Sequence, residues 1–511
     1  MTGPDANAAD YFVLRHAREG RGARVAFTDP WRSLTYAELD AATARFAAGL
    51  RKTGIKRERR VALVMLDTID FPIAFWGTIR AGVIPVPINT LLPPDITGYI
   101  LADSRTAALV VSAPLLPSLQ PVLGAVERVI VSAPDGTESG FSAFVGVADA
   151  DPALAPCSPD EVAFWLYSSG STGAPKGVRH VHSSLKATAD TYAAHILALD
   201  PDDVVFSAAK LFFAYGLGNA MTFPMAVGAS AFLFPDRPTP DAVLSVIGDR
   251  NPTVFGGVPT LYAGLLAHPG LGNGAGSSRL RLCISAGEAL PAEIGRRWRE
   301  AVGVDILDGI GSTEMLHIFL SNRRGDIRYG TTGKAVPGYE LRILDEAGND
   351  AADGDSGELV VCGPSAAEGY WNQREKSRRT FRGEWTYTGD TYIRDANGYY
   401  RYCGRSDDML KVGGIWVSPF EVEEALIAHP AVLEAAVVGH EDRDGLIKPR
   451  AFVVPQEAAL GQDREALCEL LQAHVKERIG VWKYPRWVEF ADNLPKTATG
   501  KIQRFKLRET R

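Results

Sequence analysis

The residue types that bind phosphate are concentrated in residues 167–178, which read Tyr-Ser-Ser-Gly-Ser-Thr-Gly-Ala-Pro-Lys-Gly-Val. Glycines allow backbone N–H groups to approach an oxyanion closely, hydroxyl groups add donors, and a lysine adds a positive charge. The spacing differs from the Walker A pattern, because Lys176 follows a proline and has no serine or threonine directly after it. The segment therefore predicts a nucleotide-phosphate loop of another kind, and the alternative is a surface turn. The candidate loop residues are Ser168, Ser169, Gly170, Ser171, Thr172, Gly173 and Lys176.

A second segment whose residue types could take part in binding or catalysis is residues 308–314, which read Asp-Gly-Ile-Gly-Ser-Thr-Glu. An apolar run ends there in glycines, two hydroxyl residues and the carboxylate of Glu314. A carboxylate beside a triphosphate suits magnesium, which prefers oxygen ligands. Ser312 and Thr313 are equally good helix N-caps, so a capped helix start is the alternative that the residues leave open.

Two further candidates are weaker when each is taken alone. Asp390 follows Tyr-Thr-Gly, and Arg405 lies fifteen residues later. An aspartate can accept from both hydroxyls of a ribose with an arginine in support, but Asp390 could also simply close a turn. Lys501 follows a glycine in a basic tail, where a lone lysine is usually solvated. It gains a role only if the domain that carries it can reach the nucleotide.

The elements that must position these residues alternate between strands and helices. Apolar runs at 61–66, 107–112 and 129–131 predict buried strands, and residues 36–51 carry apolar side chains at helical spacing. Strands that alternate with helices indicate parallel sheets of the α/β class.

A polar cluster at residues 405–408 follows a strand-like run and indicates a domain boundary. Residues 407–511 predict a small α+β domain. Ser418 can cap a helix, Pro419 suits its first position, and Glu421 can complete a capping box. The other elements predicted in this domain are strands at 432–439 and 451–454 and a helix at 464–479. Residues 1–406 then form the N-terminal domain.

Composition excludes several classes of protein. The 511 residues are too many for one core, so two or more domains are expected. A net charge of −7 disfavours a nucleic-acid partner. The five cysteines show no C-x-x-C spacing, which fits a reducing cytoplasm better than a disulfide framework or zinc site. The apolar stretch 71–87 contains Arg80 and prolines, so no membrane span is expected.

The four segments in this order resemble the adenylate-forming superfamily of acyl-CoA ligases, luciferases and peptide-synthetase adenylation domains. The resemblance extends from about residue 33 to the C-terminus, and it is strongest to benzoate–CoA ligases at residues 207–219, 285–291 and 315–319. It implies an α/β fold with a large N-terminal domain, made of β-sheets with packed helices and a small β-barrel-like subdomain. A small, mobile α+β C-terminal domain would carry the catalytic lysine.

The resemblance also implies ATP, Mg²⁺ and coenzyme A (CoA), and it assigns roles to particular residues. Glu314 would ligate magnesium, Thr313 would contact the α-phosphate, and Lys501 would supply the catalytic charge. Asp407 would be the hinge, and Gly413 and Gly414 would border the CoA tunnel. The remaining ATP or AMP residues would be the loop 168–176 together with Ala286, Gly287, Glu288, Asp308, Gly309, Ile310, Gly311, Ser312, Asp390 and Arg405. Most relatives carry a tyrosine in place of Ile310, so only apolar contact with the adenine is expected there.

The same resemblance places an acid pocket in two segments. Its residues would be Phe213, Ala214, Tyr215, Gly216, Leu316 and His317, with Ala286 and Gly309 beside them. Aromatic, small and apolar side chains with one imidazole suit a compact planar acid. The alternative for residues 212–215 is ordinary core. We hypothesise that His317 approaches the ring edge and favours a ring hydroxyl.

The implied function is an ATP-dependent ligase for benzoate or a substituted benzoate. It would form an acyl-adenylate and then the aryl-CoA thioester, with release of AMP and pyrophosphate, as the first step of aromatic acid catabolism. The nearest alternative is a stand-alone adenylation enzyme that loads a separate carrier protein. The Walker mismatch disfavours a kinase or ATPase, and the joint presence of the charged candidates disfavours an inactive binding protein. A homodimer is possible, as is regulation by an acetyltransferase and deacetylase acting on Lys501.

Overall fold

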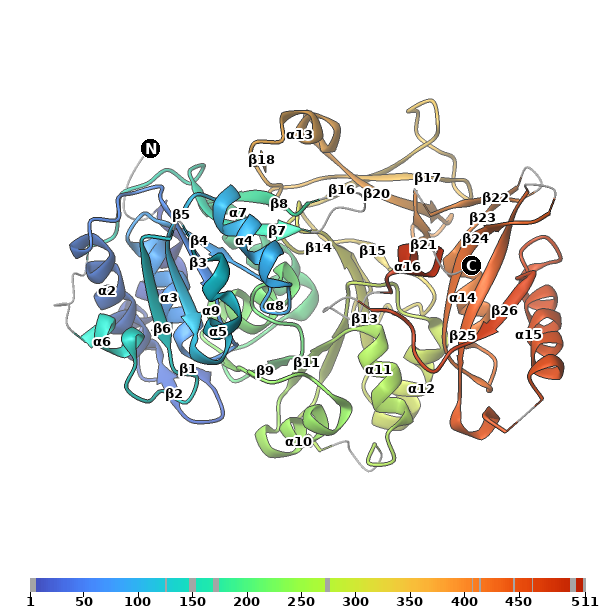
Figure 1. Ribbon diagram of the computed structural model, residues 1–511, viewed down its shortest axis with the longest axis horizontal. Helices are drawn as coiled ribbons and strands as arrows, with labels where there is room; N and C mark the ends of the chain where they lie inside the picture. Colours follow the sequence, from blue (N-terminus) through green and yellow to red (C-terminus); the bar gives the residue numbers. More distant parts are fainter. Residues whose placement is uncertain are drawn as a thin grey trace.

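The described strands form six sheets, and the long axis of the molecule runs from the sheet of β3 to β6, past a large central sheet, to the sheet of β24 to β26 (Figure 1). The computed structural model describes residues 6–124, 126–146, 153–168, 174–271, 276–406, 408–412, 415–443, 446–461, 463–496 and 502–508. None of the helices in these ranges is long and apolar enough to cross a membrane.

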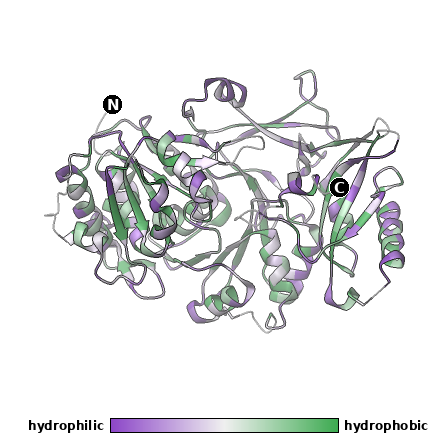
Figure 2. Ribbon diagram, in the orientation of Figure 1, coloured by the Kyte–Doolittle hydropathy of each residue, from purple (hydrophilic) through white to green (hydrophobic). Residues whose placement is uncertain are grey.

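The first sheet is parallel and has the strand order β4-β3-β5-β6. Its strands are β3 (Arg60–Val64), β4 (Ile84–Pro87), β5 (Thr106–Ser112) and β6 (Arg128–Ser132). The three strands predicted in this region are therefore present. Val61 and Leu63 face one apolar core while Ala62 and Val64 face another, so the sheet is buried on both sides. Figure 2 shows the resulting concentration of hydrophobic residues along these strands.

Helices cover both faces of this sheet. The predicted helix at 36–51 is α2 (Tyr36–Lys52), which begins with a reciprocal capping box between Thr35 and Glu38. The helical elements in this part of the chain are η2 (Asp10–Leu14), α1 (Arg15–Arg18), α2, α3 (Asp70–Arg80), α4 (Pro94–Asp103), η3 (Ala113–Leu115), α5 (Leu116–Leu119), η4 (Gln120–Val122) and α6 (Gly140–Gly146).

The central sheet has nine strands in the order β15-β14-β13-β12-β11-β9-β10-β1-β2. The strands from β1 to β13 along this order pair in parallel, and antiparallel pairing occurs only towards the two edges. The strands are β1 (Val25–Thr28), β2 (Ser33–Thr35), β9 (Val204–Ser207), β10 (Ser230–Phe232), β11 (Val254–Gly257), β12 (Leu282–Ser285), β13 (Ile306–Gly311), β14 (Ile318–Ser321) and β15 (Lys334–Ala335). Ser285 at the end of β12 pairs with Asp308 in the middle of β13, so the segment that follows β12 leaves the sheet beside the second half of β13.

The helical elements associated with this sheet come from residues 182–302. They are α7 (His182–Thr188), η5 (Ala189–Leu197), α8 (Ala214–Leu217), η6 (Gly218–Thr222), α9 (Phe223–Val227), α10 (Pro240–Arg250), α11 (Pro259–Ala267) and α12 (Ala292–Val302). Helix α12 lies on the side of the sheet that faces the C-terminal part of the chain (Figure 1).

Two antiparallel sheets complete the part of the chain before residue 406, and one of them joins distant segments by pairing β18 with β8. One has the order β18-β8-β7, and the other has the order β16-β17-β20-β19 with β21 paired to β20. Their elements are β7 (Val162–Ser168), β8 (Lys176–Val181), β16 (Glu340–Leu344), β17 (Ser356–Cys362), β18 (Gly369–Tyr370), α13 (Arg374–Thr380), β19 (Phe381–Arg382), β20 (Trp385–Arg394) and β21 (Tyr400–Arg405).

The C-terminal part folds around a core of its own. Ala435 and Val437 face that core while Ala436 and Val438 face a second apolar cluster, which is the alternation of a sheet covered on both sides. The elements are β22 (Leu410–Val412), β23 (Ile415–Val417), α14 (Pro419–Ile427), β24 (Val432–Glu441), β25 (Ile447–Pro455), η7 (Glu457–Ala459), α15 (Arg464–Ile479), β26 (Trp487–Phe490) and α16 (Arg504–Arg508). The predicted strands and the helix at 464–479 are present.

The predicted capping box at the start of α14 is only half formed. Ser418 Oγ accepts from the Glu421 amide at 3.1 Å, as expected. The carboxylate of Glu421 instead accepts from Lys483 Nζ at 2.7 Å, so a charged partner from another element takes the place of the Ser418 amide. The domain boundary at residues 406 and 407 stays a prediction, since Asp407 lies outside the described ranges.

Candidate active site

Lys176, Tyr370 and Glu314 form a partly buried charged cluster. Lys176 Nζ lies 2.8 Å from Tyr370 Oη and 3.2 Å from Glu314 Oε1, and Tyr370 Oη donates to Glu314 Oε1 at 2.8 Å. Burial alone would raise the pKa of Glu314, but Lys176 and the Tyr370 hydroxyl outweigh it and hold that pKa below its ordinary value. Glu314 is therefore an ionised carboxylate beside a cation, at the end of the candidate phosphate loop.

The backbone around Glu314 is held by several neighbouring groups. His180 Nε2 donates to the Thr313 carbonyl at 2.7 Å, and the Ala367 amide donates to the Glu314 carbonyl at 2.8 Å. Burial lowers the pKa of His180 to about 4, so the imidazole is neutral at pH 7. No helix begins at residue 312. Ser312 Oγ accepts from the Met315 amide at 3.1 Å within a turn that leads to β14, so the alternative of a capped helix is wrong.

Asp390 and Arg405 are cross-strand partners on β20 and β21. Arg405 Nη1 donates to Asp390 Oδ1 at 3.0 Å and to the Thr388 carbonyl at 3.0 Å. Gly389, which precedes Asp390, has a φ of 70°, and a Cβ there would lie 2.8 Å from Arg405 Nη2. The two predicted ribose residues are thus brought together, and the positive φ of Gly389 within β20 favours glycine at that position.

The predicted adenine residues lie at the adjacent ends of two parallel strands. Ala286, Gly287 and Glu288 follow β12, while Asp308, Gly309, Ile310 and Gly311 belong to β13. Gly287 has a φ of 96°, which favours glycine. Glu288 Oε1 accepts from the backbone amide of Ile502 at 3.0 Å, so the C-terminal segment reaches this edge of the sheet.

The first part of the predicted acid pocket is a tightly folded loop. Tyr215 Oη lies 3.1 Å from the carbonyls of both Gly257 and Ile284, which orients the ring at the ends of β11 and β12. A Cβ on Gly216 would lie 2.1 Å from the Lys210 carbonyl oxygen, so only glycine fits there. Phe212 is buried while Phe213 and Ala214 are half-buried, so the segment is not uniformly core.

Asp67 holds the loop that leads into α8. Its two carboxylate oxygens each lie 3.2 Å from the Leu211 amide nitrogen. Burial raises the pKa of Asp67 to about 6, and this effect exceeds the opposing effects of nearby Lys210 and the Leu211 amide. Lys210 Nζ donates to the carbonyls of Phe234 and Asp236. The carboxyl of Asp67 is thus a positioning contact for the acid-pocket loop.

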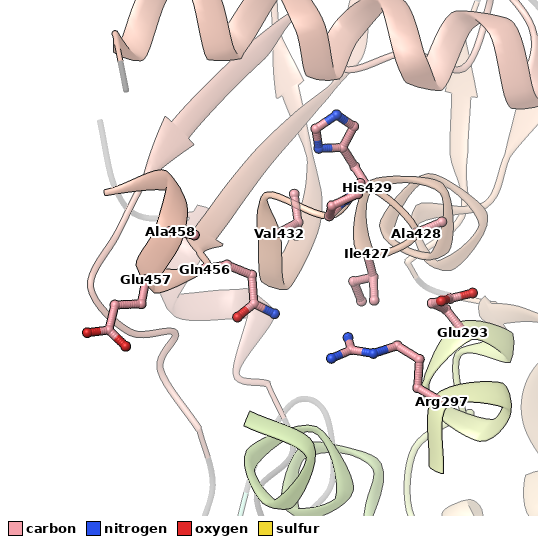
Figure 3. A pocket seen from close by; sticks show the side chains of 10 residues that line it. Glu293, Arg297, Ile427, Ala428, His429, Val432, Gln456, Glu457 and Ala458 are labelled. Atoms are coloured by element: carbon pink, nitrogen blue, oxygen red, sulfur yellow. The ribbon is translucent and has the colours of Figure 1, made fainter. Parts of the chain in front are cut away.

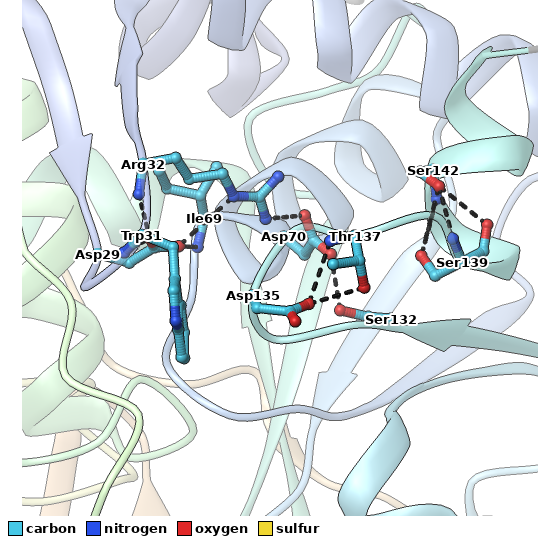
Figure 4. Close-up of polar contacts among 10 residues, drawn as sticks. All are labelled: Asp29, Trp31, Arg32, Ile69, Asp70, Ser132, Asp135, Thr137, Ser139 and Ser142. Atoms are coloured by element: carbon cyan, nitrogen blue, oxygen red, sulfur yellow. Dashed lines mark hydrogen bonds and ion pairs between the residues drawn. The ribbon is translucent and has the colours of Figure 1, made fainter.

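Two further carboxylates, those of Asp29 and Asp70, hold the turn that follows Asp67 (Figure 4). Asp29 accepts from the amides of Arg32 and Ile69, at 2.9 and 3.1 Å. Asp70 accepts from the Arg32 guanidinium and from Ser132 Oγ, the latter at 2.7 Å. The carboxyl end of the first sheet is therefore tied by buried polar contacts to β1 and to the turn that carries Asp67.

His317 is buried and lies among aromatic rings. Its ring centroid is 4.5 Å from that of Phe223, 5.1 Å from that of Tyr192 and 5.8 Å from that of Tyr215. Burial lowers the pKa of His317 to about 3. Nε2 lies 3.3 Å from the Tyr215 carbonyl, so this nitrogen carries the proton of the neutral ring. Nδ1 is then a buried acceptor, and no group in the described part of the chain pairs with it.

The residue before His317 has an unusual backbone. Leu316 has a φ of 64°, in the left-handed region that non-glycine residues rarely adopt. The turn that carries Glu314 towards Lys176 thereby carries His317 towards Tyr215. Strain of this kind persists where the surrounding packing imposes it, and it is common in functional sites.

The structure pairs Lys176 with Glu314, Asp390 with Arg405, and His317 with Tyr215. Nine other candidates lie outside the described residues. Those others are Ser169, Gly170, Ser171, Thr172, Gly173, Asp407, Gly413, Gly414 and Lys501. Ser168 is described, and its Oγ is buried with no partner among the described groups.

Sequence reasoning missed Tyr370, His180 and Asp67. Tyr370 reaches Lys176 only because β18 pairs with β8 across 190 residues, so no local pattern could have indicated it. An inward-facing histidine in the alternating strand β8 was a usable signal for His180.

The chain matches two family models of known proteins. Residues 14–371 match the AMP-binding enzyme family, and residues 421–501 match the AMP-binding enzyme C-terminal domain. The chain belongs to the AMP-binding enzyme family. The predicted membership of the adenylate-forming superfamily is thereby confirmed.

The relatives within this family include aromatic acid–CoA ligases. A benzoate–CoA ligase of Thauera aromatica is 55% identical over 98% of this chain and 95% of its own length. A 4-hydroxybenzoate–CoA/benzoate–CoA ligase of Rhodopseudomonas palustris is 51% identical over 99% of this chain and 94% of its own. The crystal structure of a benzoate CoA ligase from Burkholderia xenovorans matches with a TM-score of 0.92 and 51% identity, over 98% of this chain and all of that one. The predicted α/β fold class and the resemblance to benzoate–CoA ligases are confirmed.

Proposed function

We propose that this protein is an AMP-forming ligase that couples benzoate or a substituted benzoate to coenzyme A at the expense of ATP. The observation that carries the proposal is the turn at residues 312–317. It directs Glu314 towards Lys176 on the phosphate side and His317 towards Tyr215 on the acid side. A carboxylic acid and the phosphates of a nucleotide would therefore meet across one short turn.

The residues on the phosphate side suit ATP and magnesium. Glu314 is ionised and half-buried beside Lys176. The Ser168 hydroxyl, which has no partner among the described residues, could donate to a phosphate oxygen. Glu314 would hold Mg²⁺, which would neutralise charge on the phosphates. Thr313 would contact the α-phosphate, and Asp390 with Arg405 would bind the ribose.

The first step is attack of the acid carboxylate on the α-phosphorus of ATP, with pyrophosphate as the leaving group. Two anions must approach, so positive charge near the α-phosphate lowers the barrier. Lys501 supplies this charge, while the loop 168–176 binds the departing pyrophosphate. The contact between Ile502 and Glu288 supports this assignment, because it brings the backbone next to Lys501 to the adenine-binding edge.

The second step is attack of the CoA thiolate on the carbonyl of the acyl-adenylate, with AMP as the leaving group. We propose that residues 407–511 rotate about Asp407 between the two steps. This rotation withdraws Lys501 and brings Gly413 and Gly414 to the tunnel through which CoA enters. The division into residues 1–406 and 407–511 belongs to the same proposal.

The acid pocket favours a planar aromatic acid. Leu316 and Tyr215 belong to the apolar cluster around His317, and Phe213 packs against Phe212. His317 Nδ1 is a buried acceptor with no partner among the described groups. A neutral ring hydroxyl can donate to Nδ1, whereas benzoate leaves it unpaired. Hydroxybenzoates should therefore be accepted alongside benzoate.

The proposal is tested with a panel of acids, scoring AMP and pyrophosphate with and without CoA. Benzoate and hydroxybenzoates should give AMP, and the aryl-CoA should accumulate only when CoA is present. Aliphatic acids of similar size should react far more slowly. AMP formation that CoA does not change, with no thioester, would indicate a carrier-loading enzyme instead, and ADP as product would exclude the adenylate mechanism.

Other parts of the proposal concern regulation and assembly. Acetylation of Lys501 by an acetyltransferase would remove the charge that adenylation requires, and a deacetylase would restore it. Mass spectrometry of the protein before and after incubation with acetyl donors tests this. A homodimer and a cytoplasmic location stay predictions, and sedimentation tests the first.

A further inference from the structure

Two polar contacts join the C-terminal domain to one short segment of the N-terminal domain, residues 288–292. A separate contact lies between β21 and α14, where the ring centroids of Tyr402 and Phe420 are 5.4 Å apart. The Ile502 amide donates to Glu288 Oε1 at 3.0 Å, and the Ala292 amide donates to Glu424 Oε1 at 3.3 Å. The two bonds run in opposite directions, since each domain supplies one amide and one carboxylate. We refer to these four residues as the domain joint.

A groove lies directly beside the domain joint, between α12 and the end of α14 (Figure 3). Its volume is about 680 Å³. Arg297 on α12 extends into it towards Ile427 and Gln456, and Arg297 and Glu457 are exposed. Close apolar packing therefore does not hold α12 to this part of the C-terminal domain, and the polar contacts of the joint gain importance.

Ala292 is the first residue of α12, and its amide has no acceptor within the helix. The preceding residue, Pro291, provides no side-chain cap. Glu424 of the C-terminal domain supplies the missing acceptor. A carboxylate at a helix N-terminus is also favoured by the aligned peptide dipoles.

We propose that Glu424 is a positioning residue for the adenylation step. Its bond to the Ala292 amide stabilises the domain arrangement in which the segment next to Lys501 contacts Glu288. The rotation proposed above for thioester formation breaks this bond. A contact made in only one of two arrangements shifts their equilibrium by the free energy of that contact. The inference rests on the proposed function, because it concerns one of its two half-reactions.

Two variants remove the bond from opposite sides. Glu424→Ala removes the acceptor. Ala292→Pro removes the donor at a position where proline is well tolerated, because it is the first residue of the helix. Pro291 has φ −56° and ψ 133°, the extended conformation that a residue before proline prefers. Melting temperatures of both variants establish that they are folded.

Each variant should slow single-turnover pyrophosphate release without CoA by about three- to tenfold. Thioester formation from supplied aryl-adenylate should not slow. The double variant should lose no more than either single variant, because both substitutions remove the same bond. Glu477→Ala on the exposed face of α15 is the matched control and should leave both half-reactions unchanged.

Equal loss in both half-reactions, or additive losses in the double variant, would overturn the proposal. Hydrogen exchange provides a readout that needs no activity. Peptides covering the start of α12 and residues 502–508 should exchange faster in Glu424→Ala than in the wild type. The two proposals fail through different results. The proposed function fails if the wild type activates no aromatic acid. This inference fails if hydrogen exchange in Glu424→Ala equals that of the wild type.

Discussion

The acid pocket and the domain joint differ in how their parts are held. Around His317 the packing is close, and a Cβ on Gly218 would lie 2.4 Å from the imidazole Cδ2. At the domain joint, Glu424 reaches Ala292 over 3.3 Å beside a groove of about 680 Å³. The part proposed to select the acid is therefore close-packed, whereas the contact of α12 with the domain proposed to bring the catalytic charge is polar and borders a groove.

This difference fits the two demands of the proposed reaction. Discrimination between similar acids requires a pocket whose shape does not relax, which close packing provides. Two successive reactions at one site require an arrangement that can change at low cost. Small polar interfaces between domains allow such motion.

The comparison is tested most strongly at Lys501. Replacement by alanine should slow adenylate formation by about 10²–10³-fold, because the charge that offsets two approaching anions is lost. Thioester formation from supplied benzoyl-adenylate should continue at nearly the wild-type rate. Rapid-quench measurement of the two half-reactions checks this, and equal losses in both would contradict a separate role for the mobile domain.

The close packing of the acid pocket is tested by Gly216→Ala. The added Cβ would meet the Lys210 carbonyl at 2.1 Å, so the loop must shift. We expect kcat/KM for the acid to fall about 10²-fold, because small displacements of a positioned substrate are costly. Gly248→Ala on α10, where a Cβ meets no atom of the described residues within 4 Å, should leave kcat/KM unchanged. A fully active Gly216→Ala enzyme would show that the pocket relaxes easily.

The polar support of the pocket is tested by the pH dependence of stability in Asp67→Asn. The pKa of Asp67 is about 6 in the folded protein and ordinarily 3.8. A raised folded pKa contributes stability that is fully present below pH 3.8 and is lost as the pH rises through 6. Relative to the variant, the wild type should therefore lose about 2 kcal/mol of unfolding free energy between pH 4 and pH 7.

Urea unfolding of both proteins across this pH range measures that difference. Asp95→Asn on the exposed surface of α4 is the matched control and should follow the wild-type profile. Parallel profiles for wild type and Asp67→Asn would mean that Asp67 is not held in a desolvated site.

The smallest expected effect concerns the choice of acid. His317→Ala removes the buried acceptor, so the preference for hydroxybenzoates relative to benzoate should fall about tenfold. The wild-type preference should not vary between pH 6 and pH 8 through His317, because burial lowers its pKa to about 3. Competition assays with acid pairs measure the ratio, with exposed His195→Ala as control. If His317→Ala keeps the wild-type preference between hydroxybenzoates and benzoate, His317 is excluded as the residue that discriminates between them.

Local patterns predicted much of the fold, and the reason is visible in particular elements. Helix α15 occupies the predicted residues 464–479, and β3, β5 and β6 lie where apolar runs were found. Spacing of apolar residues is a local property that burial enforces directly. The capping box at Ser418 was only half correct, because Lys483 from a distant element competes for Glu421.

By itself the sequence determined the types of chemistry available: the phosphate-binding composition near Lys176, the carboxylate of Glu314, the imidazole of His317 and the order of the segments that carry them. Only the tertiary structure decided that Tyr370 joins Lys176 to Glu314, that Asp67 supports the pocket loop, and that Glu424 caps a helix of the other domain. These contacts join residues that are far apart in the chain. They depend on sheet pairing and domain contact, which no local spacing encodes.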